Sequence, residues 1–114
     1  MEMIHSDNAP AALGPYSQAM RVGSLVYTSG QIGIDPAAGK ITSATVDGQA
    51  AQVCANLRAV LAAAGTDLTR VVKTTCFLAD MGDFVAFNEV YARHFTSKPA
   101  RSCVAAKALP AGAL

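Results

Sequence analysis

The sequence predicts a single α+β domain with both of its helices packed on one face of a mixed β-sheet. Several short segments are rich in β-branched and aromatic residues, which is typical of strands. Two longer segments carry apolar residues at helical spacing, and each of them connects one strand to the next. Because the 114 residues contain no internal repeat, low-complexity tract or linker, one domain is expected to cover residues 1–114.

The first third of the chain is predicted to form strands and turns. A short strand is expected at residues 3–6, followed by a loop rich in Ala, Pro and Gly. Residues 17–22 and 25–31 flank the pair Gly23-Ser24, which favours a tight hairpin. Residues 35–39, Asp-Pro-Ala-Ala-Gly, form a turn sequence, because Pro fixes one backbone angle and Gly accepts a left-handed one.

The first helix is expected over residues 46–64. Thr45 or Asp47 is suited to cap its start, and Gly65 is suited to end it. Its apolar residues share one stripe, which should face the core: Val53, Leu57, Val60, Leu61 and Ala64.

A strand at residues 71–78 precedes the second helix. We expect Asp83 to cap this helix, in which four aromatic residues share a face: Phe84, Phe87, Tyr91 and Phe95. A last substantial strand should run from Arg101 to about Lys107.

The composition indicates self-association. The chain is 52% apolar and only 15% charged, whereas roughly 25% charged residues is usual. The helices cover one face of the sheet, so another subunit is the natural cover for the other face. An Ala-rich monomer is the alternative that composition alone leaves open.

Charge and cysteine content narrow the functional class. The net charge is +1, and the nine Lys and Arg residues are scattered, so a nucleic-acid partner is not expected. Three cysteines without a CxxC pair favour free thiols in a reducing compartment. With no secretion signal and no apolar run long enough to span a bilayer, we expect a cytoplasmic protein. His5 and His94 share no ligand spacing with the cysteines, so no metal site is expected.

Five segments, taken together, resemble a known family. They are Gly-Pro-Tyr-Ser-Gln-Ala at 14–19, Thr-Ser-Gly-Gln-Ile at 28–32, the block at 72–81, the helix from Asp83 through Asn88 and Tyr91, and Pro-Ala-Arg-Ser-Cys-Val at 99–104. In this order and spacing they are similar to the YjgF/Rid family of small deaminases. The resemblance implies a chorismate-mutase-like α+β fold, a homotrimer, and ligand pockets between subunits. It also implies hydrolysis of reactive 2-imino acids (2-iminobutanoate, 2-iminopropanoate) to 2-keto acids and ammonia, without a metal or organic cofactor.

The chemistry of such a substrate identifies candidate residues. A 2-imino acid needs an anion clamp, a positioned water and proton transfer to nitrogen. Arg101 is the best clamp in the chain, because a guanidinium matches a carboxylate with two parallel hydrogen bonds. Cys103 should point the same way along the strand, and the resemblance implies that its backbone helps to hold the ligand while its thiol lines the pocket. Without the resemblance, a solvated arginine is the simpler reading of Arg101.

Four further residues complete the candidate site. Tyr16 follows Gly14-Pro15, so its ring could wall the pocket while its hydroxyl binds the ligand, although an interface tyrosine is equally consistent. Ser29 beside Gly30 could present a hydroxyl and open backbone to the ligand. Asn88 could bond across to the pocket or to a neighbouring subunit, or simply contact water.

One departure from the family pattern affects the catalytic step. Family members continue beyond the Leu-Pro-x-Gly segment into a strand whose glutamate positions or activates the water. The sequence given ends at Leu114, so this glutamate has no counterpart in it, and Glu89 is the nearest acid on the matched helix. Two alternatives therefore stay open beside the deaminase: an endoribonuclease or translation inhibitor, and a non-catalytic carboxylate-binding or chaperone-like trimer.

Overall fold

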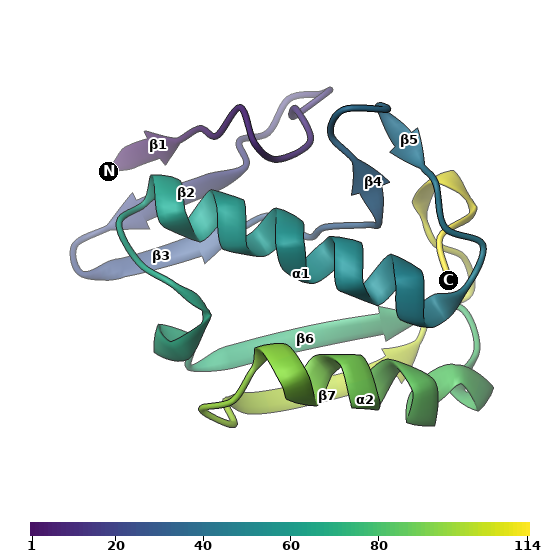
Figure 1. Ribbon diagram of the computed structural model, residues 1–114. Helices are drawn as coiled ribbons and strands as arrows, with labels where there is room; N and C mark the ends of the chain where they lie inside the picture. Colours follow the sequence, from purple (N-terminus) through teal and green to yellow (C-terminus); the bar gives the residue numbers. More distant parts are fainter.

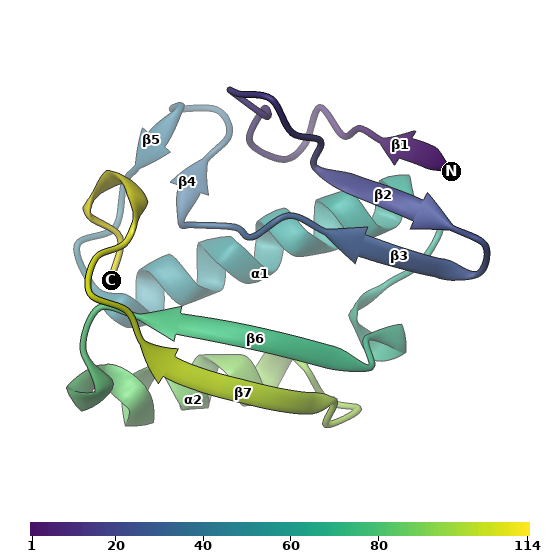
Figure 2. The same cartoon turned by 180° about the vertical axis from the view of Figure 1, so that it is seen from behind.

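Both helices lie on one face of the strands, as the sequence predicts (Figures 1 and 2). A computed structural model describes all residues, 1–114. Its strands form three hydrogen-bonded groups, two antiparallel and one parallel. The groups are β1 (Glu2–Ile4), β2 (Ala19–Val22) and β3 (Leu25–Thr28); β4 (Ile34–Asp35) and β5 (Lys40–Ile41); and the parallel pair β6 (Lys73–Leu78) and β7 (Ala100–Ala105). The helices are α1 (Val46–Ala63) and α2 (Phe84–His94).

The two expected turns are confirmed. Val22 pairs with Leu25 across the β2–β3 hairpin, and Gly23 has a φ of 59°. In the second turn, Asp35 accepts a hydrogen bond from the backbone N–H of Ala37, and Gly39 has a φ of 71°. Glycine is suited to both positions because it alone adopts positive φ without steric cost. The two-residue strands β4 and β5 that flank this turn were not anticipated, and the other strands are shorter than expected.

Helix α1 begins and ends as predicted. The Thr45 hydroxyl accepts a hydrogen bond from the N–H of Gly48 at 3.3 Å. Gly65, with a φ of 80°, ends the helix, and the N–H of Thr66 donates to the carbonyl of Leu61. On the predicted stripe Val60 is completely buried, and it joins β1 and β2 in one core cluster. A second cluster packs α1 against α2 through Cys54, Leu61, Leu68, Tyr91 and Phe95.

The predicted cap of helix α2 was wrong. Asp83 precedes the helix but its side chain caps nothing. The preceding 3₁₀ turn, Met81–Asp83, is capped instead by Asp80, which accepts a hydrogen bond from the N–H of Gly82. Because this turn leads directly into α2, the capping is performed three residues earlier than expected. The shared aromatic face is confirmed, with the Tyr91 and Phe95 rings stacked at 4.4 Å.

The strand face opposite the helices is exposed and partly apolar. Tyr27, Phe77 and Val104 are 61%, 56% and 49% exposed, and they come from β3, β6 and β7. Figure 2 shows β3, β6 and β7 on the side of the molecule away from α1 and α2. Neither helix combines the length and apolar character that crossing a membrane requires.

Candidate functional site

Arg101 is held in one orientation at the start of β7. Its Nη1 donates a hydrogen bond to Oδ1 of Asn88 on α2 at 2.6 Å. The guanidinium carbon lies 4.6 Å from the ring centre of Tyr91 and 5.4 Å from that of Phe84. The Tyr91 hydroxyl is itself bound to the hydroxyl of Thr74 at 2.7 Å. These contacts leave most of the guanidinium N–H groups unused, and no carboxylate of the chain pairs with it.

Arg101 and Asn88 line a cavity of about 430 Å³ between the end of α2 and the start of β7. Tyr91 and Phe95 form part of its wall, and Lys98 and Pro99 line it from the connecting loop. The lining contains no acidic residue. A cavity with a fixed guanidinium and no counter-charge is suited to bind an anion.

Tyr16 and Gly30 line a different and smaller cavity of about 190 Å³. Tyr16 is 55% exposed, and its ring lies against Gly14. A Cβ built on Gly30 would meet no atom within 4 Å, so this position leaves the backbone open to a ligand. No residue lines both cavities. Within one subunit, the structure therefore separates Tyr16 and Gly30 from Arg101 and Asn88.

Ser29 is engaged inside the protein. Its hydroxyl donates a hydrogen bond to the carbonyl of Ser17 at 2.5 Å, and its N–H donates to the carbonyl of Gln18 at 2.9 Å. The hydroxyl hydrogen is therefore committed, and only the oxygen lone pairs remain for a ligand. Ser29 can therefore present its hydroxyl to a ligand only as a hydrogen-bond acceptor.

Cys103 shares a strand face with Arg101, as its spacing predicts. Both side chains are half-buried, whereas those of Ala100, Ser102 and Val104 are exposed. In the backbone register of the parallel strands, Cys103 lies beside Cys76 of β6, and both cysteines are free thiols. Burial raises the pKa of the Cys76 thiol. Neither cavity is lined by Cys103.

Neither histidine lines either cavity. His5 pairs with Asp7, and Nδ1 of His94 lies 3.1 Å from Arg58. Burial, and secondarily the Arg58 charge, lowers the pKa of His94. Glu89 is exposed on α2 and lines neither cavity.

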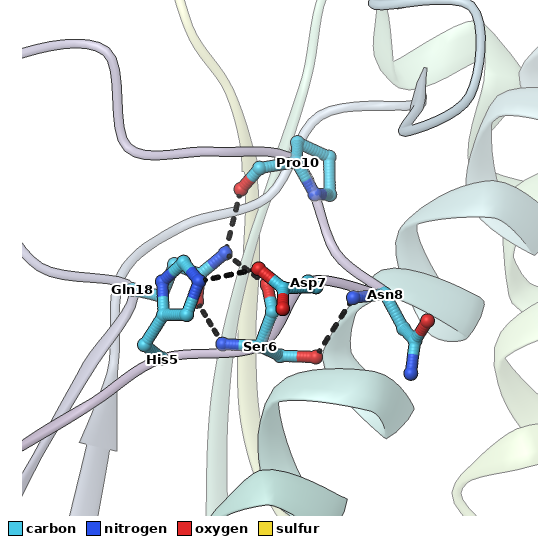
Figure 3. Close-up of polar contacts among 6 residues, drawn as sticks. All are labelled: His5, Ser6, Asp7, Asn8, Pro10 and Gln18. Carbon is cyan, nitrogen blue, oxygen red and sulfur yellow. Dashed lines mark hydrogen bonds and ion pairs between the residues drawn. The ribbon is translucent and has the colours of Figure 1, made fainter.

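A buried amide, not anticipated from the sequence, holds the loop that carries Tyr16. Gln18 is 3% exposed, and its Oε1 accepts a hydrogen bond from the N–H of Ser6 at 2.7 Å. Its Nε2 donates to the carbonyls of Ser6 and Pro10. Figure 3 shows Gln18 between these two parts of the loop, with Ser6 also accepting from Asn8. Gln18 therefore fixes one wall of the Tyr16 cavity.

A second buried amide positions another part of the lining of that cavity. Asn56 of α1 is 1% exposed, and its Nδ2 donates to the carbonyls of Ile32 and Ile34. Both isoleucines line the Tyr16 cavity. In the sequence, the one sign of this role is a polar residue in the middle of a helix, on the face that packs inward. Polar residues in helices are more often exposed to solvent.

Comparison with known proteins shows the family of the chain. Residues 6–114 match the family described as Endoribonuclease L-PSP. The chain is 53% identical to the RutC family protein y4sK of Sinorhizobium fredii, over 99% of this chain and 90% of that protein. It is 48% identical to human 2-iminobutanoate/2-iminopropanoate deaminase, over 96% and 81%.

A solved structure, E. coli TdcF with bound serine, superposes with a TM-score of 0.94. It is 39% identical, and the match covers 99% of this chain and 91% of TdcF. The five signature segments, the α+β fold and the family match over residues 6–114 lead to one conclusion: the chain belongs to the YjgF/Rid family.

Proposed function

We propose that this protein hydrolyses reactive 2-imino acids to 2-keto acids and ammonia. The observation that carries the proposal is the Arg101 guanidinium, oriented by Asn88 and by the Tyr91 and Phe84 rings in a cavity without a counter-charge. The name of the human relative gives this activity, and the serine bound to TdcF is a ligand with the α-carboxylate that such a clamp would hold.

The proposed reaction divides into binding, addition and release. Arg101 holds the substrate carboxylate through two parallel hydrogen bonds, and the Cys103 backbone lies two residues along the same strand. Water adds to the C=N carbon and forms a tetrahedral carbinolamine. A proton then passes to nitrogen, the C–N bond breaks to release ammonia, and loss of the hydroxyl proton leaves the 2-keto acid. Fixing the carboxylate holds the electrophilic carbon in place, which lowers the entropic part of the barrier.

The second group of residues would reach the substrate from a neighbouring subunit. Tyr16 and Gly30 line another cavity of the same chain, and Ser29 precedes Gly30 in the sequence, so we infer that this group meets Arg101 across an interface. A homotrimer with the exposed strand faces inward would bring the two groups together. Tyr16 then offers a hydroxyl near the imine, and Ser29 offers its free lone pairs.

A coupled assay tests the activity. Threonine dehydratase generates 2-iminobutanoate from threonine, and the lifetime of the imine is followed with and without the purified protein. We expect faster imine loss in its presence, and an unchanged lifetime with folded, assembled protein would contradict the proposal. In the same preparation, RNA cleavage that falls steeply with salt and disappears in Arg101→Ala would favour the endoribonuclease instead.

A further inference from the structure

A second cation lines the Arg101 cavity. Lys98, in the loop between α2 and β7, lies on the same cavity wall as Pro99 and precedes Arg101 by three residues. Its side chain makes no hydrogen bond or ion pair within the chain. Three residues span at most about 10 Å of backbone, and both cationic residues line the same cavity.

The backbone at Lys98 is unusual for its residue type. Its φ is 54°, and only Ala111 among the other non-glycine residues has a positive φ. Glycine or asparagine adopts this left-handed conformation with less strain than lysine does. The residue before a proline also normally prefers extended backbone. A long cationic side chain therefore occupies a position where backbone geometry alone would favour another residue type.

The cavity offers these two charges no partner of its own. Its lining holds no Asp or Glu, and the Asn88 side-chain oxygen is already bound to Arg101. A ligand with one carboxylate would occupy Arg101 and leave Lys98 to solvent. A ligand with a second carboxylate would neutralise both charges.

We propose that Lys98 selects 2-imino acids that carry a second carboxylate on the side chain. This inference rests on the proposed function, because it assigns a substrate class to the same site. Arg101 binds the α-carboxylate, Lys98 binds the distal carboxylate, and the imine carbon lies between them. Lys98 is a specificity-determining residue and takes no part in the proton transfers.

Binding of stable products separates this inference from the catalytic proposal. Titration calorimetry at low salt compares 2-oxoglutarate, with two carboxylates, against 2-oxobutanoate, with one. We expect 2-oxoglutarate to bind more tightly by a factor of up to about five, which is what one added ion pair near the surface can supply. The preference should shrink as salt is raised, because the Lys98 contact is open to solvent.

Variants at position 98 identify the source of the preference. Lys98→Asn removes the charge and suits the left-handed backbone, so it should fold normally, bind 2-oxobutanoate as before and lose the preference. Lys98→Arg should retain it. Lys40→Asn is the matched control, because Lys40 lies in β5, away from the α2–β7 loop (Figure 1), and should change nothing.

Two outcomes overturn the inference in different ways. Equal binding of the two keto acids, or an unchanged preference in Lys98→Asn, removes the role of Lys98 and leaves the Arg101 clamp intact. Failure of both keto acids to bind a folded, assembled protein removes the clamp, and with it the proposed function.

Discussion

Side-chain contacts fix the orientation of Arg101, the proposed carboxylate clamp. Its guanidinium is bound by Asn88 and stacked on Tyr91, which is in turn tied to Thr74. Each contact removes rotational freedom that ligand binding would otherwise have to remove. The face of the aromatic ring also attracts the positive charge of the guanidinium. The proposed clamp is therefore positioned by β6, β7 and α2 together.

Outside that clamp, Gln18 is the polar residue whose substitution we expect to lower stability most. Gln18→Leu removes three hydrogen bonds and leaves the N–H and carbonyl of Ser6 and the carbonyl of Pro10 unpaired. We expect a loss of about 1–3 kcal/mol in the free energy of unfolding, measured by urea denaturation. Gln31→Leu is the control, because Gln31 lies near the same cavity and its amide makes no hydrogen bond within the chain. Equal stability of the two variants would contradict the assigned role of Gln18.

Helix α1 fixes the site through its contact with the segment before β4. Gly33 packs against the helix so closely that an added Cβ would lie 3.0 Å from Cα of Gln49. Asn56, two turns along the same helix, binds the carbonyls of Ile32 and Ile34. The helix therefore holds the Tyr16 cavity in place by steric fit and by hydrogen bonds.

Two glycine substitutions compare a tightly packed position with an open one. Gly33→Ala must displace helix backbone, and we expect it to cost about 1–3 kcal/mol of unfolding free energy. Gly30→Ala meets no atom, so its stability should stay within about 0.5 kcal/mol of the parent. Thermal or urea unfolding measures both. A Gly33→Ala protein as stable as Gly30→Ala would show that this helix contact is looser than the structure indicates.

Sequence patterns predicted the elements better than their connections to the site. Thr45, Gly65 and the Gly23-Ser24 hairpin follow local rules, and all three are confirmed. The Asp83 cap failed because a 3₁₀ turn, which has no periodicity of its own, precedes α2. Arg101 and Cys103 share a face because strand periodicity is local.

The roles of Gln18, Asn56 and Lys98 could not be read from the sequence. Gln18 binds residues 8 and 12 positions away, and Asn56 binds residues 22 and 24 positions away. Lys98 matters only because the chain turn brings it into the Arg101 cavity. Such contacts depend on tertiary packing, which local patterns do not encode.

At the scale of the whole molecule, the exposed strand face calls for a partner. Tyr27, Phe77 and Val104 lie on it, and a soluble monomer rarely exposes a large contiguous apolar patch. We expect sedimentation equilibrium to give about three times the 11.7 kDa subunit mass. A monodisperse species of the subunit mass at micromolar concentration would contradict the trimer.

Mixing two inactive variants tests whether the site spans subunits. Arg101→Ala and Tyr16→Ala proteins, unfolded together in equal amounts and refolded, should recover about a quarter of the parental activity, because random assembly gives about that share of interfaces an intact pair. Each variant refolded alone should stay inactive. Absence of recovery in assembled mixtures would place both residues in the site of one subunit.

The most direct test of the central claim is the catalytic efficiency of Arg101→Lys in the imine assay. Lysine keeps the charge but loses the planar two-point contact, and Arg70→Lys controls for an exposed arginine outside both cavities. We expect kcat/KM to fall about ten- to hundredfold in Arg101→Lys, equivalent to roughly 1.5–3 kcal/mol, with assembly unchanged and Arg70→Lys fully active. Full activity in a folded, assembled Arg101→Lys protein would contradict the carboxylate clamp.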